Sequence, residues 1–223
     1  MKVEIIPVIL AKDFAEVLAR VTALKDLAAW AQIDVVDGKF APNTTWDDPT
    51  QLASLDTALR FEIDLMVAEP ERAVERWLLA APRVGRIYFH QEALESQAQG
   101  HRLIARIRSA GIEAGMSLNP KTPIDALESF AQKLDAVLCL GVPPGFGGQQ
   151  FHEEVIEKVR ALHKRYPVLP IEVDGGVRVG VARLLAQAGA IRLAAGSAIF
   201  DFDAVPIAEE LALLEKDANS HSL

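Results

Sequence analysis

The chain has 223 residues, a formal net charge of -8 and a single cysteine, Cys139. The acidic balance argues against a nucleic-acid partner, because proteins neutralise the phosphate backbone with lysine and arginine. One cysteine excludes an internal disulfide framework and favours a reducing compartment, so we expect a cytoplasmic protein. The apolar stretch at residues 3–10 is too short to cross a bilayer, and we expect no membrane partner.

Short apolar segments alternate with longer amphipathic segments along the whole chain. The apolar segments predict strands at residues 3–10, 31–36, 61–67, 86–89, 113–118, 136–141, 171–173 and 191–195. Apolar residues at three- and four-residue intervals predict helices at residues 14–24, 71–80, 101–109, 124–132, 153–165, 177–187 and 208–214. A shorter helix is expected near residues 50–59.

This alternation predicts an α/β fold with a parallel sheet covered by helices. Eight such units favour closure into a (β/α)8 barrel, and no linker divides residues 1–223, so we expect a single domain. An open doubly wound sheet is the alternative, but it usually carries a glycine-rich turn after the first strand, and residues 10–13 contain no glycine. In a barrel, functional residues lie where strands end and the following loops begin.

Glycine-bearing turns follow the sixth, seventh and eighth predicted strands. Their residues are Gly145, Phe146, Gly147 and Gly148, then Gly175 and Gly176, then Gly196 and Ser197. Each turn alone is explained by a tight or flexible loop. Glycine also lets backbone N–H groups approach an anion, and barrels commonly bind phosphate after strands seven and eight. The three turns together therefore predict one phosphate site.

Acidic residues at three strand ends form a second group of candidates. Asp34 and Asp64 lie inside apolar strands, and Asp174 follows the seventh strand. Carboxylates are seldom buried unless they are paired, hydrogen-bonded or bound to a cation, so we expect all three to face one cavity. A capping role for Asp174 and an outward orientation for Asp64 are the alternatives. His90, at the end of the fourth strand, is either structural or directed to the same site.

Seven motifs resemble those of the ribulose-phosphate 3-epimerase family over nearly the whole chain. They are IDVVDGKFAPN from Ile33, DLMVAEP from Asp64, FHQEA from Phe89, LNPKTP from Leu118, PGFGGQQF from Pro144, VDGG from Val173 and AGSAIF from Ala195. The resemblance implies a TIM barrel of the ribulose-phosphate-binding type, in which the last three motifs hold the substrate phosphate. It also implies that Asp34 and Asp174 transfer a proton on opposite faces of the carbon beside a ketone, through an enediolate.

The resemblance further implies a divalent metal, which the family holds with two histidines and these two aspartates. Here Gln32 and Asp64 stand at the histidine positions, and Val8 replaces a first-strand serine. Amide and carboxylate oxygens favour Mg, Mn or another hard cation over Zn. We therefore hypothesise an oxygen-rich metal site of Asp34, Asp64 and Asp174, with Gln32 as a further ligand, and we expect no organic cofactor.

Two functions stay open on this reading, a ketose-phosphate 3-epimerase and a non-catalytic phosphosugar-binding protein. The retained aspartates favour the first, and the replaced histidines favour the second. A related barrel lyase is the weakest alternative. Such lyases resemble this chain in the phosphate region but carry a lysine after the third strand, and residues 64–70 contain none. In every case the expected partner is a small sugar phosphate. Because family members are often oligomeric, a homo-oligomer is also expected.

Overall fold

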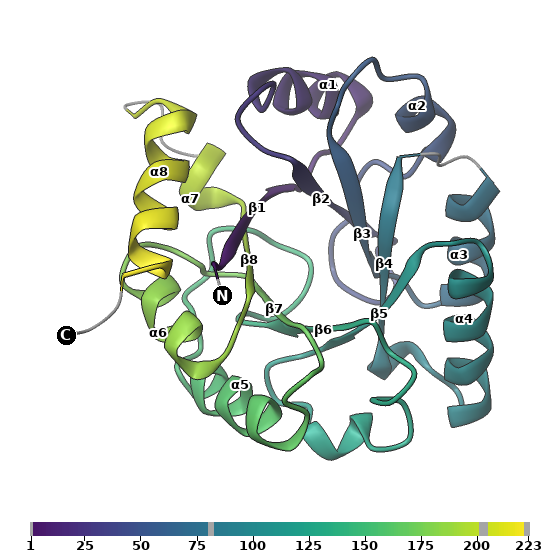
Figure 1. Cartoon of the computed structure of the whole chain (residues 1–223). Coiled ribbons are helices and arrows are strands. Elements are labelled where there is room, and N and C mark those ends of the chain that lie inside the picture. The colour runs from purple at the N-terminus through teal and green to yellow at the C-terminus, as the bar shows by residue number, and fades with distance from the viewer. Residues whose placement is uncertain (1, 80–82, 201–204, 221–223) are drawn as a thin grey trace.

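A closed barrel of eight parallel strands forms the centre of the molecule. The computed structural model describes residues 2–79, 83–200 and 205–220, and its strands pair in chain order until β8 meets β1 (Figure 1). The strands are β1 (Glu4–Ile9), β2 (Trp30–Val36), β3 (Arg60–Met66), β4 (Val84–His90), β5 (Glu113–Leu118), β6 (Ala136–Leu140), β7 (Ile171–Asp174) and β8 (Arg192–Ala195). The predicted (β/α)8 fold is confirmed, and the open sheet is excluded.

Helices surround the barrel on its outer side (Figure 1). They are α1 (Phe14–Ala23), α2 (Pro49–Ala53), α3 (Pro70–Leu79), α4 (Gln97–Ser109), α5 (Glu154–Arg165), α6 (Val181–Ala188), α7 (Ser197–Phe200) and α8 (Ile207–Ala218). Two 3-10 segments, η1 (Gln91–Ala93) and η2 (Ile124–Leu127), complete the elements. No helix of the described residues combines the length and the apolar character needed to cross a bilayer.

Several predicted helix boundaries are wrong. The segment 124–132 is a 3-10 segment, η2, followed by turns, in which Leu127 O accepts from both Phe130 N–H at 2.8 Å and Ala131 N–H at 2.9 Å. The helix expected at 50–59 ends at Ala53. Helix α4 begins earlier than expected, because the side chain of Ser96 caps it. The predicted last residue of 71–80 lies outside the described residues.

Side-chain alternation along the strands separates an apolar outer core from a polar barrel interior. In β2, Ile33 and Val35 belong to the large hydrophobic core under the helices. The intervening Gln32 and Asp34 are also buried, so they face inward. Asp34 is in register with Asp64 of the neighbouring strand β3. This alternation explains how acidic residues can sit in strands that are otherwise apolar.

A layer of buried polar and charged residues fills the barrel interior beneath the aspartates, toward the amino-terminal ends of the strands. The Arg86 guanidinium contacts Glu62 and lies 3.6 Å from Glu172 Oε2, while the Tyr88 hydroxyl donates to the same Glu172 oxygen at 2.6 Å. Burial and the charge of Glu172 raise the pKa of Glu62. The layer closes the interior beneath the strand ends, so the cavity that holds the aspartates opens toward the loops.

Candidate active site

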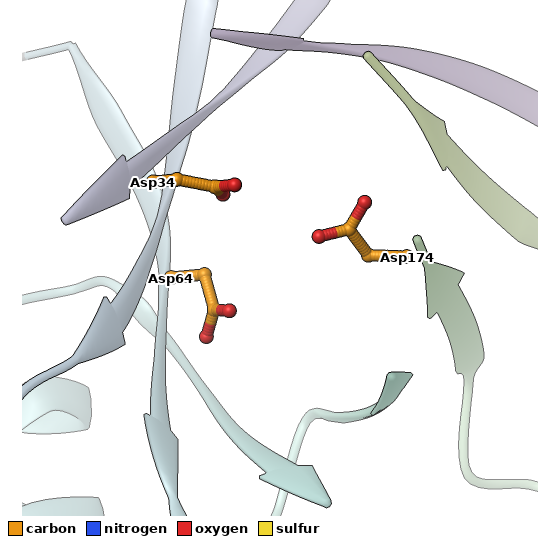
Figure 2. Close-up of side chains that lie close together, drawn as sticks. All are labelled: Asp34, Asp64 and Asp174. Atoms are coloured by element: carbon orange, nitrogen blue, oxygen red, sulfur yellow. The ribbon is translucent and has the colours of Figure 1, made fainter. Parts of the chain in front are cut away.

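Three buried aspartates converge at the carboxyl ends of the strands. Asp34 and Asp64 come from adjacent strands β2 and β3, and Asp174 approaches from β7 on the other side of the barrel (Figure 2). One carboxylate oxygen from each lies within 4.8 Å of the others. The structure therefore brings together the three carboxylates that the sequence singled out. Asp64 does not point outward, and Asp174 is more than a capping residue.

Gln32 links two of these aspartates through its amide nitrogen. Its Nε2 donates to Asp34 Oδ1 at 2.7 Å and to Asp174 Oδ2 at 3.0 Å. The amide oxygen Oε1 is buried and has no hydrogen-bond partner among the described residues. In this arrangement Gln32 is a hydrogen-bond donor to the two carboxylates, and its role as a further metal ligand stays a prediction. Two acceptors draw the donor side of the amide toward them, since its oxygen would be repelled there.

Asp64 has its own set of partners deeper in the barrel. Ser117 Oγ donates to Asp64 Oδ1 at 2.7 Å, and His90 Nε2 lies 3.4 Å from Asp64 Oδ2. Burial opposes a charge on His90, but the carboxylates of Asp64 and Glu92 outweigh it and raise the His90 pKa to about 9. His90 is thus directed at Asp64 from a buried position, which is compatible with both interpretations that the sequence left open. Ser117 was missed, although its inward position in β5 gave a signal.

Burial and mutual repulsion raise the pKa of the two aspartates that Gln32 links. Burial is the largest cause for Asp34, followed by the charges of Asp174 and Asp64, and the Asp34 pKa rises well above its ordinary value. Burial and then Asp64 raise the pKa of Asp174 to about 7, against the hydrogen bond from Gln32. Without a cation, the site therefore retains protons at a pH where ordinary aspartates are ionised.

The three glycine turns line one pocket beside these carboxylates. All eight predicted residues contribute to its wall, as do Asp34, Asp174 and Val8. The pocket has a volume of about 110 Å³. Gly176 has a φ of +70°, and a Cβ there would lie 3.0 Å from the Phe151 Cα atom, so only glycine fits without strain. Turns that lie far apart in the sequence thus line a single pocket.

One pocket residue could not be found from the strand-end rule. Arg20 lies on α1, yet its side chain reaches the same pocket as Gly196 and Ser197. The rule that functional residues of a barrel lie in the loops after strands gives no signal for a charged residue within a helix.

Comparisons with known proteins bear on the whole barrel. Residues 4–200 match the model of the family described as "Ribulose-phosphate 3 epimerase family". The ribulose-phosphate 3-epimerase of Schizosaccharomyces pombe is 38% identical over 205 residues, covering 90% of this chain and 88% of that protein. The ribulose-phosphate 3-epimerase of Mycobacterium tuberculosis is 36% identical over 227 residues, covering 98% and 94%. These matches confirm the resemblance that the motifs indicated.

Solved structures at low sequence identity share the fold. The orotidine 5'-phosphate decarboxylase of Pyrococcus horikoshii superposes with a TM-score of 0.67 at 13% identity, covering 97% of this chain and 100% of that chain. A mutant tryptophan synthase alpha-subunit from Pyrococcus furiosus gives 0.66 at 19% identity, covering 98% and 99%. At such identities the likeness supports the barrel and carries no information about activity.

Proposed function

The chain belongs to the ribulose-phosphate 3-epimerase family, an isomerase family, and we propose that it is itself a ketose-phosphate 3-epimerase. One observation carries the proposal: Asp34 and Asp174 line the same pocket as the three glycine turns. A phosphate held by the turns leaves the sugar end of the substrate beside the two carboxylates. A phosphate site alone would suit many barrels, but an acid pair next to it suits proton transfer.

The two aspartates divide the proton transfer between the faces of the substrate. One carboxylate removes the proton from the carbon beside the ketone, and the electron pair of that C–H bond moves toward the ketone oxygen to give an enediolate. The other returns a proton to the same carbon from the opposite face, which inverts it. An Asp174 pKa of about 7 suits this role, because a general acid or base works best when its pKa lies near the working pH.

We propose that Asp34, Asp64 and Asp174 also hold a divalent cation. One carboxylate oxygen from each lies within 4.8 Å of the others, and burial followed by repulsion from neighbouring carboxylates raises the pKa of Asp34 and Asp174, a cost that a shared cation would offset. An all-oxygen ligand set favours Mg or Mn over Zn. When bound, such a cation stabilises negative charge on the enediolate oxygens. Ser117 and His90 fix the orientation of Asp64 from behind.

A specific contact favours the alternative, a sugar-phosphate-binding protein without catalysis. The Gln32 amide already bridges Asp34 and Asp174, so neutral N–H groups hold the two carboxylates together without a cation. If that bridge persists when the substrate binds, both aspartates are engaged and the pocket only holds the phosphosugar. Turnover decides between the two functions.

The experiment is an epimerisation assay with ribulose 5-phosphate and other ketose phosphates, run on chelated protein and after adding Mg, Mn or Zn. We expect turnover that is highest with Mg or Mn and that falls by roughly 100- to 10,000-fold in Asp34→Asn, since the variant loses an acid–base group. Asp125→Asn, an exposed carboxylate paired with Arg165, is the matched control and should retain full activity. Phosphosugar binding without turnover under every cation would select the binding protein instead.

A further inference from the structure

The phosphate pocket contains one positively charged side chain within the described part of the chain, and it comes from outside the glycine turns. Arg20 of α1 lines the pocket together with Gly196 and Ser197. Its guanidinium lies 4.9 Å from the centre of the Phe200 ring, at the end of the short helix that Ser197 begins. Residues from opposite ends of the sequence thereby place a cation at the pocket wall.

The Arg20 side chain is held in place but still has donors to offer. Its Nη2 donates to Glu16 Oε1 at 2.7 Å, one turn earlier on α1, and only 22% of the side chain is exposed. Within the described residues, Nη1 and Nε make no hydrogen bond. The ion pair with Glu16 and the contact with the Phe200 ring fix the guanidinium. Its remaining N–H donors are therefore arranged to bind a phosphate or carboxylate.

A positive charge in this pocket would interact favourably with a bound phosphate. A phosphate monoester carries almost two negative charges, and it would sit in a pocket whose other charged residues are Asp34 and Asp174. The glycine amides are neutral, and α7 has only four residues, which gives it a small dipole. A divalent cation at the aspartates would offset their own charges, and Arg20 is the lining residue that can place a positive charge beside the phosphate itself.

We propose that Arg20 is a phosphate-binding residue of this pocket, adding a charge-assisted contact to the amides of the glycine turns. The inference rests on the proposed function, in which the pocket receives a sugar phosphate. A purely structural role is the competing explanation, because stacking on Phe200 also attaches α1 to α7. Arg20→Met separates the two roles, since methionine keeps an apolar stem against the ring and removes the charge and its donors.

The first measurement is calorimetric binding of inorganic phosphate to wild-type protein and to Arg20→Met. We expect the variant to bind phosphate roughly ten- to a hundredfold more weakly, the range expected for a lost hydrogen bond to a charged group. Arg20→Lys, which keeps the charge without the fork, should lie between them. Arg20→Gln, which can still reach Glu16, gives the same comparison if methionine prevents folding. The matched control is Arg102→Met, because Arg102 lies on α4 outside the pocket and is likewise paired with a glutamate, Glu71.

The second measurement separates this inference from the proposed function. With a ketose phosphate as substrate, Arg20→Met should raise KM and leave kcat nearly unchanged, because the phosphate contact is the same in ground and transition states. Unchanged phosphate affinity and unchanged KM in both Arg20→Met and Arg20→Gln would overturn the role of Arg20 while leaving the epimerase intact. Weakened phosphate binding in a protein that epimerises no substrate would support Arg20 and reject the proposed activity.

Discussion

Removing divalent cations should make the folded protein lose stability as the pH rises. Burial and the neighbouring Asp64 raise the pKa of Asp174 from 3.8 to about 7. A carboxyl whose pKa is higher in the folded state binds its proton more tightly there. The contribution of Asp174 to the free energy of unfolding is therefore fully present below about pH 4 and is lost as the pH rises through about 7. The difference between 3.8 and about 7 corresponds to roughly 4 kcal/mol for Asp174, and Asp34 adds to it in the same direction.

Urea unfolding of chelated protein, followed by tryptophan fluorescence, measures this loss. Between about pH 5 and pH 8 we expect the free energy of unfolding to fall by several kcal/mol in the wild type and by clearly less in Asp174→Asn. Asp125→Asn, which changes an exposed carboxylate, should follow the wild type. Adding Mg or Mn at about pH 8 should restore stability, because the cation binds the ionised carboxylates of the folded state. Equal pH dependence in the wild type and Asp174→Asn would refute the reasoning.

The remaining predictions concern the surroundings of the aspartates and the pocket wall. Ser117→Ala should weaken divalent-cation binding about tenfold, because it removes the 2.7 Å hydrogen bond that orients Asp64. Calorimetry measures this affinity, and an unchanged value would argue against that role of Ser117. Gln32→His should shift the cation preference toward Zn, measured by competition between Zn and Mn, and an unaltered order would count against Gln32 facing the metal. Gly176→Ala should destabilise the protein by about 1–3 kcal/mol in urea unfolding, because of its positive φ and the close Phe151 backbone; a stability within 0.5 kcal/mol of wild type would contradict the steric argument.

The barrel and its three aspartates could be predicted because their signals are local. A carboxylate in an apolar strand must face inward or outward, and the two-residue period of the strand places Asp34 opposite to Ile33 and Val35. The strand ends of a barrel then collect such residues at one face. Asp64 and Asp174 follow the same rule, but the sequence left an outward Asp64 and a capping Asp174 open, and only the folded barrel shows that the three carboxylates converge.

Contacts between distant segments could not be predicted in the same way. The interaction of His90 and Ser117 with Asp64 depends on the registers of β3, β4 and β5, which the sequence does not state. The reach of Arg20 into the pocket depends on its contact with the Phe200 ring of α7. The direction of the Gln32 amide is decided by two carboxylates that meet only in the folded barrel. The assignment of residues 1–223 to one domain and the expected homo-oligomer stay predictions.

Solvent isotope exchange tests the central claim most directly, because it reports proton transfer at one carbon atom. A ketose phosphate incubated in deuterium oxide with the cation-loaded protein should acquire deuterium at the carbon beside the ketone, in both epimers, as followed by NMR. Asp34→Asn and Asp174→Asn should each abolish epimerisation and the incorporation into one epimer, because the carboxylate that remains can exchange the proton on its own face only. No incorporation with the wild type under any cation, or undiminished incorporation with either variant, would contradict a reaction carried by two carboxylates on opposite faces of the bound sugar.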